Sequence, residues 1–483
     1  MTAGWEIVIG LEVHAQLLTR SKMFCGCATA FGAPPNHQTC PICQGMPGVL
    51  PVINRRAIEF GIRTARALHC RINGSSRFAR KHYFYPDMPK NYQISQYEAP
   101  LAEEGWLEVE VDGAVRRVGV ERLHLEEDVG KLTHEGGLFE TASASLVDFN
   151  RAGVPLMEIV SRPDLRAPGE AAEYLRCLRA ILRYLGVCDG NMEAGSLRCD
   201  ANVSVRRIGA TELGTKVEIK NMNSFRHVRD ALEHEAARQI RALDRGERVV
   251  QETRLWNPDR GLTVAMRSKE YAHDYRYFPD PDLVPVEPDP AWVAAIDREL
   301  PELPRVRRQR FVAEYALPLH DAELLTGDRA LADYFEEAVR VHPNPKALAN
   351  WIGSELLREL RGDPAAVTDA PVRPPALARL VALVDEGTIS GKMAKELFER
   401  MVRTGEGPDA IVRREGLRQV ADEDAIGRVI DQVVAAHPGV VGDYRGGKKQ
   451  AAGFLVGQVM KATQGKANPQ VVNRLLAERL GAG

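Results

Sequence analysis

A cluster of five prolines between residues 279 and 290 limits the fold of this chain more than any other feature. The five are Pro279, Pro281, Pro285, Pro288 and Pro290. Proline lacks the backbone N–H and clashes with the preceding helical turn, so we expect neither a helix nor a central strand through this stretch. Residues before the cluster carry both strand and helix patterns, whereas residues after it carry only helix patterns. The cluster therefore predicts a domain boundary.

The chain has 483 residues, 44% hydrophobic and 27% charged, which indicates a soluble globular protein of about three domains at roughly 150 residues each. No apolar run approaches the roughly 20 residues of a membrane helix. The amino terminus lacks the basic segment of a signal peptide, so we expect a cytoplasmic protein. A second break, at Gly405, Gly407 and Pro408, completes a predicted division into residues 1–293, 294–405 and 406–483, the last two entirely helical.

Two helices are well signalled in the first domain. One is expected from about Ala171 to Leu185, ending at Gly186, and the other follows Asn223 and Ser224 and ends near Gly246.

Charge is nearly balanced over the whole chain, with 64 basic and 66 acidic residues. This balance excludes a protein that holds nucleic acid by bulk positive charge. From Asp443 to the C-terminus, however, seven basic residues face two acidic ones. The tail is therefore a candidate nucleic-acid contact.

Four of the eight cysteines are close together in sequence, as Cys25-x-Cys27 and, after twelve residues, Cys40-Pro-Ile-Cys43. Short spacings within each pair and a loop between them are typical of a tetrahedral zinc site. The alternatives are four reduced thiols in a loop or, less favoured, redox chemistry. A site closed by four sulfur atoms has no open position, so zinc here would brace the fold without catalysing a reaction.

Alternation along three predicted strands separates an apolar face from a polar one. In Glu6–His14 the residues Leu11 and Val13 oppose Glu12 and His14, and Leu197–Val205 and Lys216–Lys220 alternate in the same way. Oxygen ligands with at most one imidazole suit magnesium better than zinc. The candidate polar face carries Glu12, His14, Glu126, Glu127, Asp128, Glu158, Asp200 and Glu218. The competing interpretation is a solvated strand face that happens to be charged.

One position on this face conflicts with the alternation. Continued through the strand, the pattern places Glu126 on the polar side and Glu127 with Leu123 and Leu125. Only a strand end or a β-bulge nearby would release Glu127 to the polar side.

Two aromatic segments, Lys81–Asp87 and Asp274–Asp280, place basic side chains beside rings and prolines. Such loops suit stacking of a nucleobase or a terminal adenosine. The alternative is that the rings anchor loops to the core.

Two absences narrow the class of enzyme. The segment Gly387–Met393 is one residue short of a phosphate-binding loop and ends in Met393 where a hydroxyl is required, so nucleotide binding by a P-loop is excluded. There is no G-x-S-x-G motif or serine-rich amidase segment either, which argues against a self-contained amide hydrolase.

Several longer motifs, in order along nearly the whole chain, closely resemble the B subunit of the aspartyl/glutamyl-tRNA amidotransferase. They are Val8–His14, Tyr83–Asp87, Tyr92–Gln96, Leu123–Asp128, Gly195–Asn202, Lys220–Phe225 and Phe454–Met460. The segment Glu135–Ser145 is longer than the family pattern, and we expect it to be a surface excursion.

The resemblance implies an α+β fold: a glutamine-synthetase-like cradle domain with an antiparallel sheet, then an all-α domain and a small helical tail that binds tRNA. It implies ATP-dependent phosphorylation of the side-chain carboxylate of a mischarged glutamyl- or aspartyl-tRNA, followed by displacement of phosphate by ammonia. Carried onto this sequence, the family's magnesium ligands fall on His14, Glu127 and Glu158. Its catalytic residues fall on Glu12, Lys81, Asp200 and Glu218, and its nucleotide contacts on Lys81, Tyr83 and Tyr85.

The resemblance also implies partners. Because no amidase machinery is visible in this chain, ammonia would come from an amidase-like A subunit that hydrolyses glutamine, and a small C subunit would complete a heterotrimer. Two alternatives remain open. One is a noncatalytic, zinc-braced, tRNA-binding scaffold, and the other is an ammonia-dependent ligase that acts alone on a small amino acid.

Overall fold

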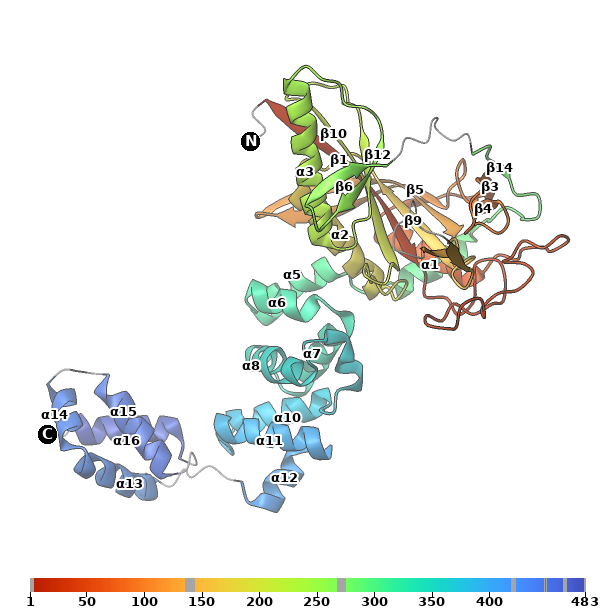
Figure 1. Cartoon of the computed structure of the whole chain (residues 1–483). Helices are drawn as coiled ribbons and strands as arrows, with labels where there is room; N and C mark the ends of the chain where they lie inside the picture. Colours follow the sequence, from red (N-terminus) through yellow and green to blue (C-terminus); the bar gives the residue numbers. More distant parts are fainter. Residues whose placement is uncertain are drawn as a thin grey trace. The chain divides into compact units, whose positions relative to one another are not determined.

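The structure is a computed structural model that describes residues 4–134, 144–266, 275–417, 423–446, 448, 450–463 and 467–481. The chain divides into two compact units, Met1–Leu303 and Pro304–Gly483. Figure 1 follows the chain from the mixed first unit to the helical second one. Most of the surface excursion expected at 135–145 lies outside the described residues, as does Asp274 of the second aromatic segment.

The first unit is built on one large twisted sheet, in the order β13-β12-β11-β10-β1-β9-β6-β5-β2. Neighbouring strands are antiparallel except for the parallel pair β11 and β12. A mixed α/β fold with a sheet rich in antiparallel pairs is therefore confirmed. The strands are β1 (Trp5–Gln16), β2 (Arg71–Ile72), β5 (Ala102–Val111), β6 (Ala114–Glu127), β9 (Pro155–Ser161), β10 (Leu197–Arg207), β11 (Val217–Lys220), β12 (Thr253–Asn257) and β13 (Leu262–Ala265).

Three helices pack on the apolar face of this sheet: α1 (Arg55–Ala67), α2 (Pro168–Tyr184) and α3 (Phe225–Asp244). Both helices predicted from sequence are confirmed. The chain leaves α2 through Gly186 at φ +66°, a left-handed conformation that glycine adopts at little cost. Ser224 caps α3 by accepting a hydrogen bond from the His227 backbone N–H at 3.1 Å.

Helix α4 (Pro290–Glu299) runs through the boundary expected after residue 293. A helix forms here because proline is tolerated in the first helical turn, where its missing N–H would have no partner. Asp289 caps the helix by accepting from the Ala291 N–H. Helix α4 then packs on α1, with Asp297 accepting from Arg66 at 2.7 Å, so it belongs to the first unit.

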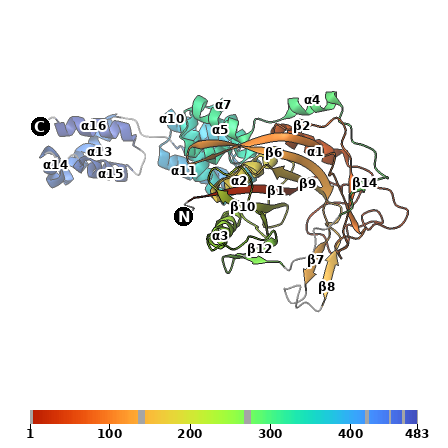
Figure 2. The ribbon, with the colours of Figure 1, turned by 90° about the horizontal axis from the view of Figure 1, so that it is seen from above.

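Two small sheets flank the large one. Strands β14 (Phe278–Pro279), β3 (Ala79–His82) and β4 (Tyr92–Ser95) form one of them, which brings the two aromatic segments side by side. Strands β7 (Lys131–His134) and β8 (Ser145–Asp148) form a hairpin, which projects from the large sheet in Figure 2.

The second unit is helical, as expected, and its described residues form two hydrophobic cores, at 311–412 and 426–480. Helix α12 (Pro408–Glu415) follows the boundary predicted after residue 405, yet its Ile411 and Val412 are buried in the first core. The elements are α5 (Pro304–Tyr315), α6 (Leu319–Thr326), α7 (Arg329–Val341), α8 (Pro345–Trp351), a π-helical turn (Ile352–Leu356), α9 (Leu357–Glu359), a 3-10 turn (Pro364–Asp369), α10 (Pro374–Asp385), α11 (Gly391–Thr404), α12 (Pro408–Glu415), α13 (Glu423–Ala436), α14 (Pro438–Arg445), α15 (Ala451–Ala462) and α16 (Pro469–Gly481).

Among the described residues, no helix has both the length and the apolar character needed to cross a membrane.

Candidate functional site

Strand register brings the predicted polar residues together on the face of the sheet opposite helices α1 to α3. Leu11 and Val13 of β1 point into the core, so Glu12 and His14 point to the other face. Glu12 lies opposite Asp200 of β10, and His14 lies opposite Glu158 of β9. One strand further, Asn202 of β10 lies opposite Glu218 of β11. Five predicted residues therefore come from four neighbouring strands.

His14, Glu126 and Glu158 form a group suited to a divalent cation. Each offers one ligand atom, and these atoms all lie within 4.8 Å of one another. His14 Nε2 is 3.5 Å from Glu158 Oε2. Two carboxylates and one imidazole, mostly buried, match the hard ligand set predicted for magnesium.

His124 is a member of this site that sequence reasoning missed. Its Nε2 lies 3.1 Å from Glu158 Oε2 and 3.8 Å from Glu126 Oε2. Burial alone lowers the pKa of His124, but the two carboxylates outweigh burial and raise it to about 9. Burial raises the pKa of Glu158, yet His124 and His14 outweigh that effect and leave the pKa well below its ordinary value. The sequence could have predicted this residue, because His124 lies two positions before Glu126 in the same strand and alternate residues of a strand point to the same face.

Glu127, expected among the magnesium ligands, lies elsewhere. Glu127 is the last residue of β6 and still pairs with Pro155, so it keeps the alternation of the strand and its side chain does not turn to the polar face. The β-bulge in this strand lies between Val120 and Arg122, too early to change the parity of Glu127 relative to Leu123 and Leu125. The Glu127 carboxylate instead forms an ion pair with Lys90 and accepts from the Ile94 N–H at 3.0 Å. Glu126 occupies the position expected for Glu127.

A second polar cluster lies next to the first, on β10, β11 and β12. Lys220 Nζ is 2.6 Å from Asp200 Oδ2 and 3.0 Å from Glu218 Oε1. Thr253 Oγ1 donates to Glu218 Oε2 at 2.7 Å. Burial raises the pKa of Glu218, but Lys220 and Thr253 outweigh it and lower that pKa. The predicted residues Asp200 and Glu218 are thus held in place by a lysine and a threonine.

Glu12 lies between the two clusters. Its Oε1 accepts from Asn202 Nδ2 at 2.9 Å. Burial, followed by the nearby carboxylates of Glu158 and Glu218, raises the pKa of Glu12. Such a carboxyl gains a proton more readily than an exposed one and suits proton transfer.

A cavity of about 890 Å³ opens above these clusters. Lys81 and Tyr83 line it, whereas Tyr85 is not among the described lining residues. The described residues that line it are His14, Lys81, His82, Tyr83, Phe84, Gln93, Glu126, Asp128, Val129, Leu156, Arg198, Asp200, Lys220, Tyr275, Arg276 and Phe278. The lining therefore combines carboxylates with cationic and aromatic side chains.

The two aromatic segments form one wall of this cavity. The His82 N–H donates to the Tyr275 carbonyl at 2.9 Å, and the rings of Tyr83 and Tyr275 meet edge to face with centroids 6.5 Å apart. Lys81 Nζ lies 4.9 Å from the centre of the Tyr275 ring. Phe84, on the cavity rim, is 77% exposed. This wall offers both a cation and unstacked aromatic surface.

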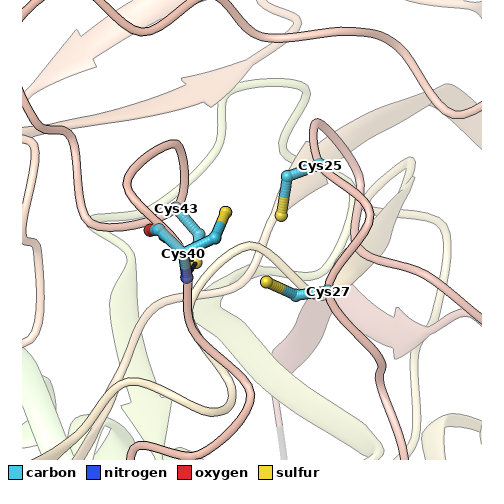
Figure 3. A group of neighbouring side chains, drawn as sticks. All are labelled: Cys25, Cys27, Cys40 and Cys43. Carbon is cyan, nitrogen blue, oxygen red and sulfur yellow. Dashed lines mark hydrogen bonds between the residues drawn. The ribbon is translucent and has the colours of Figure 1, made fainter.

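The four cysteines predicted to bind zinc also come together. Figure 3 shows Cys25 and Cys27 facing Cys40 and Cys43 across a common space, and their sulfur atoms all lie within 4.8 Å of one another. A Zn–S bond of about 2.3 Å in tetrahedral geometry requires sulfur atoms about 3.8 Å apart. None of the four forms a disulfide. The donor set and its spacing therefore fit a tetrahedral metal.

The thiols of this cluster differ in acidity. A hydrogen bond from Cys25 is the main cause that lowers the pKa of Cys43 to about 4. Burial is the main cause that raises the pKa of Cys27 to about 11. One thiolate is therefore already favoured at neutral pH, and a bound cation would favour the others.

Comparisons with known proteins agree with this architecture. A family model described as GatB/GatE catalytic domain matches residues 7–294, and one described as GatB domain matches residues 333–480. Three relatives carry the name of the B subunit of aspartyl/glutamyl-tRNA(Asn/Gln) amidotransferase. The protein of Thermodesulfovibrio yellowstonii is 56% identical, covering 98% of both chains. That of Carboxydothermus hydrogenoformans is 54% identical over 99% of both. That of Moorella thermoacetica is 56% identical over 99% of this chain and 100% of the relative. The chain therefore belongs to the family of aspartyl/glutamyl-tRNA(Asn/Gln) amidotransferase B subunits, which confirms the resemblance seen in its motifs.

Proposed function

We propose that this chain is the subunit that converts mischarged glutamyl-tRNA(Gln), aspartyl-tRNA(Asn) or both to the amidated form. The side-chain carboxylate of the esterified amino acid is phosphorylated by ATP, and ammonia then displaces phosphate. The observation that carries this proposal is the grouping of His14, Glu126 and Glu158 beside a cavity lined with cations. A carboxylate resists nucleophiles until one oxygen becomes a leaving group, and phosphoryl transfer to an anion requires positive charge around it.

In this proposal His14, Glu126 and Glu158 hold Mg²⁺, which spreads the charge of the transferred phosphoryl group when bound. Lys81 contacts the phosphates, because it lines the cavity and its Nζ lies beside the ring of Tyr275, which lines the same cavity. Asp200 and Glu218, fixed by Lys220, orient the reacting groups. Glu12 accepts the proton that ammonium must lose before it attacks, a role favoured by its raised pKa.

The nucleotide, or the terminal adenosine of the tRNA, stacks on the aromatic wall. Tyr83 and Tyr275 offer ring faces or edges at the cavity, and Phe84 is exposed on its rim. Base stacking on aromatic side chains contributes about 1–3 kcal/mol per base. Tyr85, which was also predicted to contact the nucleotide, lies in the same loop outside the lining.

The four cysteines hold a structural Zn²⁺ that braces the loop between β1 and α1. The fit of four sulfur atoms within 4.8 Å supports this assignment. The sheet and its three covering helices form a cradle similar to the glutamine synthetase fold, and the helical unit follows as two domains.

Ammonia comes from an amidase-like A subunit, and a small C subunit completes the complex. The basic tail holds the tRNA body. Of its basic residues, Lys448, Arg474 and Arg479 pair with carboxylates that lie within residues 423–478, while Lys449 and Lys466 lie outside the described residues. These paired side chains are about half exposed or more, which leaves N–H donors available to phosphates.

The decisive experiment reconstitutes the complex with ATP, glutamine and either mischarged tRNA, and compares the native chain with Glu158→Gln. We expect phosphate release that depends on mischarged tRNA, and its loss in the variant with tRNA affinity retained. Unchanged amide formation by the variant would favour a noncatalytic scaffold. Phosphate release without charged tRNA would favour a ligase that acts alone on a small amino acid.

A further inference from the structure

Lys22 is a buried cation next to the cysteine cluster. The residue is 1% exposed. Its Nζ lies 3.6 Å from Cys43 Sγ and donates to the Phe149 carbonyl at 3.1 Å. The backbone N–H of Lys22 donates to the Cys27 carbonyl at 2.9 Å, which fixes the residue against the first cysteine pair.

Within the described part of the chain, no carboxylate lies within ion-pair distance of the Lys22 amine. Lys90, which lines the same cavity of about 170 Å³, pairs with Glu127. A buried ammonium without a compensating anion is strongly unfavourable, so such groups are normally paired. The Glu127 carboxylate lines the same cavity but is engaged by Lys90 and the Ile94 N–H. Within hydrogen-bond distance of the Lys22 amine, the described residues offer the Phe149 carbonyl and the Cys43 sulfur, and of these two only the sulfur can carry a negative charge.

We propose that Lys22 is the counter-charge of the four-cysteine site and donates an N–H···S hydrogen bond to Cys43. This inference rests on the zinc site proposed above. Four thiolates and one Zn²⁺ carry a net charge of −2, and burying such a site is costly. The Lys22 ammonium reduces the charge of the assembly to −1 and orients the Cys43 sulfur toward the metal, as groups surrounding metal ligands commonly do.

The same lysine links the cluster to the segment that leads into β9. Its amine holds the Phe149 carbonyl, and the neighbouring Met23 N–H donates to the Gly153 carbonyl at 2.7 Å. Gly153, at φ +86°, has no side chain, and a Cβ there would lie 3.3 Å from Lys22 Cδ and 3.5 Å from Cys43 Cβ. The residues around Gly153 therefore pack directly on the lysine and its cysteine, only a few residues before Glu158.

The test measures how fast the full-length chain releases zinc to a chromogenic chelator, 4-(2-pyridylazo)resorcinol. The variants are Lys22→Met and, as matched control, Lys90→Met, which removes a buried ammonium from the same cavity without touching a sulfur. We expect Lys22→Met to release zinc at least about tenfold faster than both the native chain and the control. Equal rates for Lys22→Met and the native chain would overturn the proposal.

A second experiment tests whether Lys22 acts through its charge or only through its packing, by combining Lys22→Met with a change that lowers the negative charge of the site. Cys27→His keeps four ligands but replaces one thiolate by a neutral imidazole, so the site needs less compensation. We expect Lys22→Met to accelerate zinc release less than about threefold in the Cys27→His background. An undiminished effect in that background would contradict the proposal. If Lys22→Met alone does not fold, recovery of the folded double variant supports the counter-charge, and failure of both variants to fold counts against it.

The zinc content of the native chain distinguishes failure of this proposal from failure of the zinc assignment on which it rests. Much less than one equivalent of zinc in the purified native chain would refute the metal site itself. A full equivalent with no effect of Lys22→Met would leave the metal site standing and refute only the role of Lys22.

Discussion

His124 Nε2 lies 3.1 Å from Glu158 Oε2, and the same carboxylate oxygen lies 3.5 Å from His14 Nε2. His124 is 4% exposed, and its Nδ1 has no hydrogen-bond partner among the described residues. The polar contacts of this imidazole are therefore directed at Glu158 and Glu126. His124 therefore contacts both carboxylates of the proposed magnesium site, which predicts that it positions them.

Replacing His124 with alanine should weaken divalent-cation binding by about 10- to 100-fold, the usual effect of losing a group that orients metal ligands. Titration with Mn²⁺, followed by electron paramagnetic resonance, measures this affinity directly. The matched control is His342→Ala, because His342 forms a similar pair with Asp385, at 2.6 Å, in the helical unit. Equal affinities for the His124 variant and the control would show that His124 does not position the ligands.

The stability of the chain without added Mg²⁺ should fall between about pH 7 and pH 9.5. The folded pKa of His124 is raised to about 9 from 6.5, so its contribution is fully present below the unfolded pKa and is lost as pH rises through the folded one. The pKa values of Glu158 and Glu126 are lowered, so their contribution is lost instead as pH falls below about 4.5. Thermal melts across this range should show a smaller decline in Tm for His124→Gln; a decline of the same size would assign the effect to other groups.

Glu126→Gln and Glu127→Gln should separate metal binding from stability. We expect Glu126→Gln to weaken Mn²⁺ binding and suppress phosphate release, since Glu126 belongs to the metal group. Glu127→Gln should leave Mn²⁺ affinity nearly unchanged but lower the free energy of unfolding by about 3–5 kcal/mol, because the buried Lys90 ammonium loses its partner. Denaturant unfolding and the Mn²⁺ titration together check both variants. Loss of metal affinity in Glu127→Gln would restore the assignment that the family resemblance implied.

Thr253→Val should reduce the rate of transamidation without unfolding the chain. The change removes the donor to Glu218 at 2.7 Å while keeping the shape of the side chain. A hydrogen bond to a charged group contributes about 1.5–3 kcal/mol, so kcat should fall about tenfold or more. Thr253→Ser retains the hydroxyl and should restore most of the rate. If serine and valine behave alike, the hydroxyl is not what positions Glu218.

Deleting residues 418–483 should weaken tRNA binding at least about tenfold and reduce its dependence on salt, because phosphate contacts are lost. The deletion begins after α12, since removing residues from 406 onward would take Ile411 and Val412 out of the first helical core. Ammonia-dependent amide formation should remain detectable at high tRNA concentration. An unchanged affinity, measured by filter binding at two salt concentrations, would remove the tail from the tRNA contact.

Local patterns were enough to predict the elements that carry the site. Alternation in β1 and β10 correctly separated Glu12, His14 and Asp200 from the core, because side chains of a strand point to opposite faces whatever the sheet around them. The spacing of the four cysteines predicted the metal site equally well. Two closely spaced cysteine pairs at the ends of one loop can readily come together around a metal ion. The proline cluster predicted that no helix would form through residues 279–290, yet α4 begins at Pro290, because proline is tolerated in the first turn of a helix.

The amino-acid sequence by itself determined the family, the mixed first unit, the helical second unit and most of the polar face, because these depend on periodicity and on motifs read along the chain. Only the tertiary structure decided which of two adjacent glutamates joins His14 and Glu158, and it selected Glu126. It alone also revealed Thr253 and Lys22 as partners of site residues, and it showed that His124, whose strand face the alternation already gave, contacts Glu158. Contacts across strands and between distant loops depend on which segments become neighbours and in what register, and a pattern read along one segment does not specify its neighbour.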